Sequence, residues 1–260
     1  MLLILSISQN KLNTKYIMMH PMSQPALSFS VPPPTYRRRF LVFDVESTGL
    51  LPTRRGTTTA VPITEYPHIL QLSFAIYDLS QKQVIRKYDA YVDVPDDVVI
   101  SEFITNLTGI TKEKCKREGR PIVEVLEKFY EAYMFCEGLV AHNMDFDEKL
   151  ISVELERNRA VVLEKAPYCF MIFNSMYEKV HGIERYCTMR KGTEICNIMV
   201  ESKTAGKPPS RKWPKLIELY GKLFEGATVE GLHNSMVDVL TCLRCYLKMR
   251  HGYDDSTLFA

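Results

Sequence analysis

Three short acidic segments of this 260-residue chain carry residue types that could bind divalent metal ions. They read FDVESTGL at residues 43–50, AHNMDFDEKLI at 141–151 and GLHNSMVDVLT at 231–241. Their candidate catalytic residues are Asp44, Glu46, Asp147, Asp238 and His233. Carboxylate oxygens suit hard divalent cations, and a histidine that titrates near neutrality can move a proton. This set predicts a two-metal phosphodiesterase that hydrolyses nucleic acid from an end.

The first segment is expected to be a buried strand, because residues 40–45 are apolar apart from Asp44. Residues two apart on a strand face the same side, so Asp44 and Glu46 should project together. Two neighbouring acids at the end of a hydrophobic strand are costly unless a cation lies between them. The alternative is a pair of acids that faces water, and the D-x-E spacing alone does not decide between the two.

In the second segment, Phe146, Leu150 and Val153 recur at helical spacing. Asp145 and Asp147 lie about 200° apart on such a helix, so they should not share one metal ion. Asp145 fits a solvated acid that the helix dipole favours in the first turn. We therefore interpret Asp147, at the inward edge of the helix, as the ligand.

The third segment is expected to begin a helix over about residues 235–250. His233 can approach the same site as Asp238 only if it lies on the loop before this helix. Such a histidine could take a proton from the attacking water without binding metal. Alone, the pair would fit an exposed loop histidine and a surface aspartate, but all three segments in this order favour a catalytic site.

Over about residues 39–250 the chain resembles the DnaQ-like 3′–5′ exonucleases of the DEDDh type. The matching motifs are D-x-E-S-T-G-L, H-N-x-x-F-D-x-x-x-L and H-x-x-x-x-D. Asn234 stands where the tyrosine variant of the family carries its tyrosine, which indicates the histidine type. Two departures are Ser235, where an alanine is usual, and Cys187, where relatives often have aspartate.

The resemblance implies a ligand set, a general base and a substrate site. The implied ligands of two Mg²⁺ ions, which Mn²⁺ should replace, are Asp44, Glu46, Asp147 and Asp238. His233 is the implied general base. Implied substrate contacts are Thr48 and Leu50, which would hold and wedge the terminal nucleotide, and Asn143 and Phe146.

The predicted function is a 3′–5′ exonuclease that releases nucleoside 5′-monophosphates from DNA, in proofreading or repair. Its expected partners are nucleic acid with a free 3′ end and a DNA polymerase, with no membrane. One alternative is an exoribonuclease that trims RNA ends. The sequence leaves it open, because no residue can be identified that distinguishes RNA from DNA by the sugar 2′-hydroxyl. The other alternative is a non-catalytic module that docks nucleic acid or a polymerase.

Charge and cysteine content give weaker expectations. The formal net charge of +2 neither argues for nor excludes nucleic acid. Basic clusters that could hold phosphates occur at residues 37–39, 54–55 and 203–215. Seven cysteines without a signal peptide favour a reducing intracellular compartment, cytoplasm or nucleus. We interpret Cys242 and Cys245 as buried core thiols.

The order of elements predicts an α/β fold with a mixed five-stranded sheet and helices on both faces. The resemblance implies that this is a ribonuclease H-like fold. Expected strands lie near residues 40–45, 69–79, 83–94, 138–141 and 185–189. Expected helices include residues 122–135 and 214–224, and residues 198–212 are expected to form a loop. The expected domains are a disordered leader at 1–38, an exonuclease domain at 39–252 and a C-terminal tail at 253–260.

Overall fold

A computed structural model describes most of the expected exonuclease domain. The described residues are 38–53, 60–202 and 208–259. The chain divides into two units, residues 1–35 and 36–260, and all described residues belong to the second. The expected leader therefore lies outside the described residues except for Arg38, and the domain boundaries stay a prediction.

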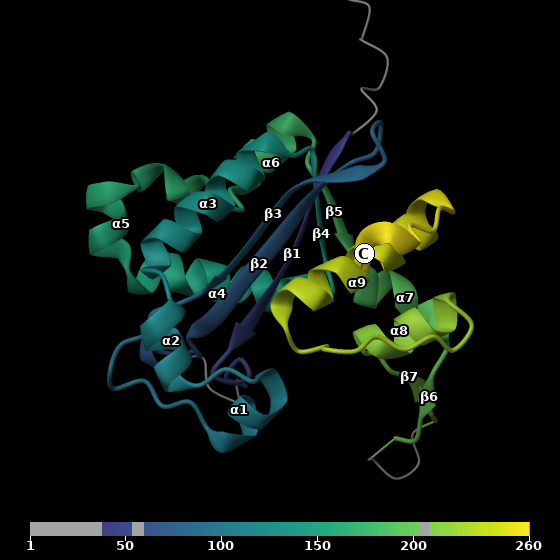
Figure 1. Cartoon of the computed structure of the whole chain (residues 1–260), viewed down its shortest axis with the longest axis horizontal. Helices are drawn as coiled ribbons and strands as arrows, with labels where there is room; N and C mark the ends of the chain where they lie inside the picture. The colour runs from purple at the N-terminus through teal and green to yellow at the C-terminus, as the bar shows by residue number, and fades with distance from the viewer. Residues whose placement is uncertain (1–37, 54–59, 203–207, 260) are drawn as a thin grey trace, which may run out of the picture. The chain divides into compact units, whose positions relative to one another are not determined.

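A five-stranded mixed sheet forms the centre of this unit (Figure 1). Its strands are β1 (Arg39–Ser47), β2 (Ile69–Asp78), β3 (Gln83–Tyr91), β4 (Gly138–Ala141) and β5 (Glu184–Cys187). Their order is β3-β2-β1-β4-β5. Consecutive β1, β2 and β3 pair antiparallel, whereas β4 and β5 pair parallel after helical crossovers. The predicted mixed five-stranded sheet is confirmed.

Helices and a short hairpin surround the sheet. The α-helices are α1 (Glu102–Thr108), α2 (Lys112–Glu118), α3 (Ile122–Phe135), α4 (Met144–Arg157), α5 (Arg159–Lys165), α6 (Ser175–His181), α7 (Thr188–Cys196), α8 (Leu216–Leu223) and α9 (Ser235–His251). The 3₁₀ helices are η1 (Ile63–Glu65), η2 (Pro167–Met171) and η3 (Ser256–Phe259). The hairpin pairs β6 (Met199–Val200) with β7 (Ser210–Arg211). Among the described residues, no helix is both long and apolar enough to cross a membrane.

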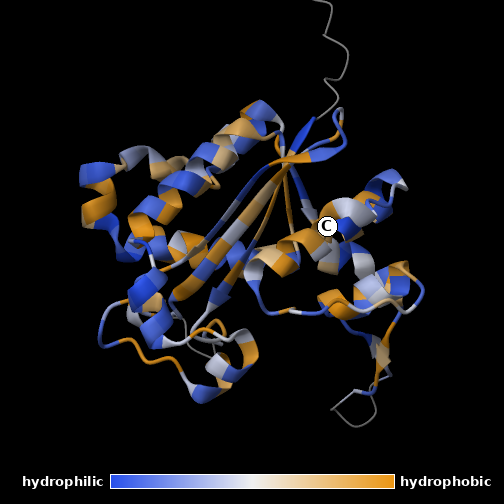
Figure 2. Cartoon of the chain, in the orientation of Figure 1, coloured by the Kyte–Doolittle hydropathy of each residue, from blue (hydrophilic) through white to orange (hydrophobic). Residues whose placement is uncertain are grey.

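Alternate side chains of β1 enter two different cores. Leu41 and Phe43 pack in the core that also contains Phe129 of α3 and Leu150 of α4. Phe40 and Val42 pack in the core formed with α9. Helices therefore cover both faces, as predicted, and Figure 2 shows hydrophobic central strands beside a more hydrophilic β3 at the edge. Because Asp44 and Glu46 continue the alternation of Phe40 and Val42, they lie on the α9 face.

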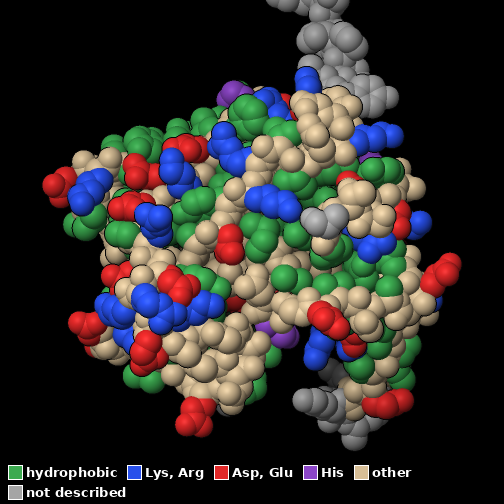
Figure 3. Space-filling view, in the orientation of Figure 1, with side chains coloured by type: hydrophobic (Ala, Val, Ile, Leu, Met, Phe, Trp, Pro, Cys, Tyr) green, Lys and Arg blue, Asp and Glu red, His purple; other side chains and the backbone are tan. Residues whose placement is uncertain are grey.

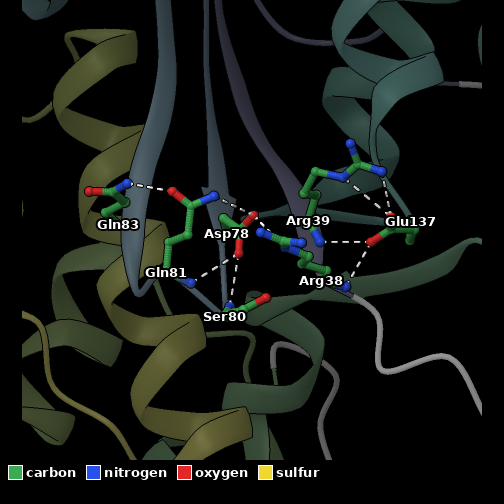
Figure 4. A network of polar contacts seen from close by, with 7 residues as sticks. All are labelled: Arg38, Arg39, Asp78, Ser80, Gln81, Gln83 and Glu137. Carbon is green, nitrogen blue, oxygen red and sulfur yellow. Dashed lines mark hydrogen bonds and ion pairs between the residues drawn. The ribbon is translucent and has the colours of Figure 1, made fainter.

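Ion pairs fix the first residues of β1, at the end opposite the acidic motif (Figure 4). The Arg38 guanidinium contacts the buried carboxylate of Asp78 at 2.7 Å. The Arg39 guanidinium contacts Glu137 at 2.8 Å, and the Glu137 carboxylate also accepts the backbone N–H groups of Arg38 and Arg39. This network holds the starts of β1 and β4 together and so sets their register.

Several expected boundaries were wrong by a few residues. β3 ends at Tyr91 rather than Val94, because Val92 instead forms an isolated parallel bridge with Arg120. β5 ends at Cys187, where α7 begins, so it does not reach Met189. The expected loop 198–212 contains the β6–β7 hairpin, whose strands have two residues each.

Candidate active site

The four predicted metal ligands come from three elements that meet at the carboxyl end of β1. Asp44 and Glu46 lie on β1, Asp147 lies in the first turn of α4, and Asp238 lies in the first turn of α9. α4 follows β4, the parallel neighbour of β1. The acidic residues at the end of β1 and at the start of α4 therefore lie at the same edge of the sheet. All four acids line one cavity of about 490 Å³.

Eight of the nine predicted site residues line this cavity. They are Asp44, Glu46, Leu50, Asn143, Phe146, Asp147, His233 and Asp238. Leu50 is 86% exposed, as a residue that wedges a nucleotide would have to be. Figure 3 shows the surface hollowed between the region of α1 and α2 and that of α8 and the β6–β7 hairpin.

Thr48 is the exception, since it does not line the cavity. Its hydroxyl accepts a hydrogen bond of 3.0 Å from the His68 N–H, and its own N–H donates to the His68 carbonyl at 2.9 Å. These bonds tie the turn after β1 to the residue before β2. Thr48 therefore holds the backbone between Glu46 and Leu50, and its predicted contact with substrate stays a prediction.

Asp44 and Asp147 each have a buried carboxylate oxygen that a bound cation would neutralise. The Oδ2 atom of each is buried without a hydrogen-bond partner among the described residues. Burial raises the pKa of Asp44 well above its usual range, and the Asp238 carboxylate adds to the shift. Burial likewise raises the pKa of Asp147, with a further contribution from Asp44. A divalent cation here would satisfy both orphaned oxygens and offset the repulsion.

Glu46 and Asp238 form the more open side of the same cluster. Burial, followed by repulsion from Asp44 and Asp238, raises the pKa of Glu46 to about 9. Burial raises the pKa of Asp238 to about 7, although a hydrogen bond from the His233 N–H opposes the shift. Potential ligand atoms of Glu46, Asp238 and His233 lie within 4.8 Å of one another. The donor set is thus four carboxylates with one imidazole beside them, which fits a hard divalent cation.

His233 lies on the loop before α9, as predicted, with a left-handed backbone at φ 68°. Its N–H donates to Asp238 at 3.1 Å, which orients the loop toward the acids. Partial burial and the nearby Lys215 ammonium lower the pKa of the imidazole, which favours the neutral ring. A neutral ring can accept a proton, and it also lies within reach of a metal bound by Glu46 and Asp238.

Ser235, a departure from the family motif, connects α9 to the sheet. Its hydroxyl donates to the carbonyl oxygen of Asp44 at 2.7 Å, and its N–H donates to the Gln71 side chain at 3.3 Å. Both Ser235 and Gln71 are buried. These bonds fix the start of α9, and hence Asp238, relative to Asp44.

Sequence reasoning missed several residues that line the cavity. They are Val45, His142, Lys215, Leu216, Ile217 and Leu232. The two His142 ring nitrogens contact the Thr188 hydroxyl at 3.0 Å and the Pro214 carbonyl at 3.1 Å. Its position directly before Asn143 in the second motif was the available signal. In the sequence, Lys215 stands out only as one member of a basic cluster.

Other sequence interpretations have clear outcomes. Asp145 is exposed and pairs with Arg190, so it is the solvated acid of the α4 first turn. Cys242 and Cys245 are buried free thiols, as predicted. The basic residues at 54–55, and those at 203–207, lie outside the described residues.

Comparison with known proteins identifies the class. The profile of the RNase T family, described as exonuclease, matches residues 41–246. The DNA polymerase III PolC-type of Lactococcus lactis subsp. lactis is 35% identical over 125 residues, which are 47% of this chain and 6% of that protein. The chain thus spans a small part of the length of the curated relatives it matches.

Solved structures of Escherichia coli exonuclease I have a similar fold. The complex with a dT13 oligonucleotide has a TM-score of 0.55 at 17% identity, covering 83% of this chain and 42% of that one. The zinc-bound form of its complex with single-stranded DNA has a TM-score of 0.56 at 17% identity, covering 86% and 42%. The predicted ribonuclease H-like fold is confirmed.

The chain belongs to the RNase T family of exonucleases. Residues 41–246, the part of the chain that matches the family, contain all four predicted metal ligands and His233. The predicted resemblance to the DnaQ-like exonucleases agrees with this assignment.

Proposed function

We propose that the chain is a Mg²⁺-dependent 3′–5′ exonuclease that releases nucleoside 5′-monophosphates from DNA. The observation that carries the proposal is the convergence of four carboxylates in one cavity, two of them with buried oxygens that lack a hydrogen-bond partner within the described part of the chain. Without a cation, the raised pKa values mean that these carboxyls retain protons near neutral pH, and a bound divalent cation would replace those protons. An all-oxygen ligand set suits Mg²⁺ better than Zn²⁺, and Mn²⁺ should substitute.

Each site residue has a defined task in this proposal. Asp44, Asp147 and Asp238, together with Glu46, hold the metal ions. When bound, two such ions polarise the scissile phosphate and stabilise the leaving oxygen. His233 accepts the proton of the attacking water, because its lowered pKa favours the neutral ring and the residue lines the cavity.

The remaining cavity residues would bind the terminal nucleotide. Leu50 and Phe146 offer apolar surface against a base, and Asn143 offers an amide for hydrogen bonds. Asn143 has a left-handed backbone at φ 66°, which asparagine tolerates better than most residues do. Thr48 would act mainly by holding the backbone that presents Leu50.

DNA is the preferred substrate in this proposal, because the curated relatives are DNA polymerases and the similar structures contain DNA oligonucleotides. The same relatives support a DNA polymerase as a partner, with roles in replication or repair. Seven free cysteines, five of them buried, support action in a reducing intracellular compartment.

The test uses matched DNA and RNA oligonucleotides that carry a 5′ label and a single-stranded, paired or mismatched 3′ end. With Mg²⁺, the wild-type protein should shorten DNA stepwise and release 5′-monophosphates that mass spectrometry identifies. Asp44→Asn serves as the inactive control. Faster shortening of RNA would instead establish the exoribonuclease. Binding of DNA without any shortening would establish a non-catalytic module.

A further inference from the structure

A second cavity, of about 390 Å³, lies between α7 and the β6–β7 hairpin, outside the catalytic cluster. It is lined by Arg190, Lys191, Thr193, Glu194, Arg211 and Trp213. Three cationic side chains thus face one carboxylate and the single tryptophan of the chain. Trp213 is 63% exposed, which is a large apolar ring for a surface position.

The segment from Arg211 to Lys215 alternates between exposed and buried side chains. Arg211, Trp213 and Lys215 are exposed, whereas Lys212 is partly buried and Pro214 is buried. In extended backbone, alternate side chains share a face and stand roughly 6–7 Å apart. The segment therefore exposes an arginine, a tryptophan and a lysine in a row at alternate positions.

This row runs from the second cavity to the catalytic cavity. Arg211 and Trp213 line the former, and Lys215 lines the latter. The segment is fixed along its length, because the Lys212 N–H donates to the Ile198 carbonyl at 3.0 Å. The Pro214 carbonyl contacts the ring of His142, a residue of the catalytic cavity, at 3.1 Å. The row is thus held at a fixed position relative to the catalytic residues.

We propose that Lys215, Trp213 and Arg211, with Lys191, bind the single-stranded nucleic acid that precedes the scissile bond. The proposal rests on the proposed function, which puts the 3′-terminal nucleotide in the catalytic cavity. The cations contact phosphates, and a base stacks on the Trp213 indole, as on the stacking platforms of proteins that bind single strands. We call these four residues the binding track. Because stacking does not depend on base sequence, the track should hold any strand that is long enough to reach it.

Trp213 supplies its own probe, since it is the single tryptophan of the chain. In EDTA, which stops cleavage, a twelve-nucleotide oligothymidylate should quench its fluorescence, and a thymidine dinucleotide should not. An abasic twelve-nucleotide strand, which has the charges but no bases, should bind without this quenching. A matching oligouridylate reports whether the track accepts RNA as well as DNA. Equal quenching by the abasic strand, or none by the oligothymidylate, would overturn the stacking.

Kinetics with Mg²⁺ give an independent measure. Trp213→Ala should lower kcat/KM for the twelve-nucleotide strand by about 10- to 100-fold, the range expected for loss of one stacked base, and leave the dinucleotide unaffected. Trp213→Phe should restore most of the loss. Met176→Ala provides the control, because Met176 on α6 is similarly exposed at 66%.

The basic residues are tested through salt dependence. Arg211→Ala and Lys191→Ala should each reduce the slope of log affinity against log salt by about 0.7, as expected for one lost phosphate contact on a single strand. Lys179→Ala, on α6, should leave the slope unchanged. Unchanged slopes for Arg211→Ala and Lys191→Ala would remove these residues from the track.

Failure of the two proposals can be told apart. If Trp213→Ala cleaves long and short substrates as well as wild type does, the track is refuted and the exonuclease stands. If wild-type protein cleaves neither substrate, the exonuclease is refuted. The fluorescence titration then decides alone whether a strand lies on Trp213.

Discussion

The side-chain hydroxyl of Ser235 donates a hydrogen bond of 2.7 Å to the backbone carbonyl of Asp44. This bond joins the first turn of α9 to β1 directly beside two predicted metal ligands. The Ser235 side chain also opposes the rise in the pKa of the Asp44 carboxyl group, which lines the cavity. Ser235 therefore aligns two parts of the catalytic cluster without itself lining the cavity.

Replacing Ser235 by alanine should destabilise the protein and loosen the site. Loss of a buried hydrogen bond costs about 1 kcal/mol, and the Asp44 carbonyl would be left without this donor. We expect urea denaturation to report that loss, together with a several-fold decrease in kcat. Ser256→Ala is the control, since Ser256 is exposed. Wild-type kcat in Ser235→Ala would mean that the remaining contacts of α9, including the backbone N–H bond to Gln71, align it without this hydroxyl.

Asp44→Asn and Asp238→Asn should abolish cleavage without unfolding the protein. Each change removes a carboxylate from a group of mutually repelling acids, so the free energy of unfolding in EDTA should stay level or rise. Circular dichroism and urea denaturation measure the fold, and release of mononucleotides measures activity. Near-normal turnover in either variant would refute the metal assignment.

Without metal, stability should fall as pH rises from about 4 to about 9. Glu46 and Asp238 ionise at their ordinary values of 4.5 and 3.8 when unfolded, but in the folded protein their pKa values are about 9 and about 7. Between these limits the folded protein binds more protons, so the free energy of unfolding decreases with pH. The decrease should level off above the folded pKa values.

Urea denaturation in EDTA at pH 5, 7 and 9 measures this dependence. Glu46→Gln should lessen the decrease between pH 7 and 9, because Glu46 has the higher pKa of the two. Saturating Mg²⁺ should stabilise the protein most at pH 9, where the carboxylates are ionised. A Glu46→Gln curve parallel to that of wild type would show that Glu46 does not retain its proton.

His233→Ala should lower activity by about 10²- to 10⁴-fold, the usual contribution of a general base. Metal affinity by calorimetry should stay unchanged, because the four carboxylates remain. Loss of metal together with activity would make His233 a ligand, a role that its distance to Glu46 and Asp238 also permits. The acid limb of the pH–rate profile should disappear in the variant.

The Lys215→Met variant tests the assignment of His233 as the general base in a second way. The Lys215 ammonium lowers the pKa of His233, so its removal should raise that pKa. The acid limb of kcat should then move to higher pH while remaining present. An unmoved limb would mean that a group other than His233 accepts the proton.

The sequence predicted the elements whose residue patterns are long and regular. The helix at residues 122–135 and the strand at 138–141 have the predicted bounds, and the acids of β1, α4 and α9 meet as expected. The β6–β7 hairpin was missed because strands of two residues show no periodicity. The Ser235 bond was missed because its partners lie 191 residues apart, and pattern within one segment cannot reveal such contacts.

The distribution of the acids along the chain also bears on how the enzyme is made. During synthesis β1 leaves the ribosome well before α9 does, because Asp44 and Ser235 lie 191 residues apart in the chain. Until α9 docks, the cluster lacks Asp238 and one face of β1 has no cover. A nascent or prematurely terminated chain would thus be inert toward the nucleic acid that surrounds it. We therefore expect nuclease activity to begin only after α9 has joined the sheet.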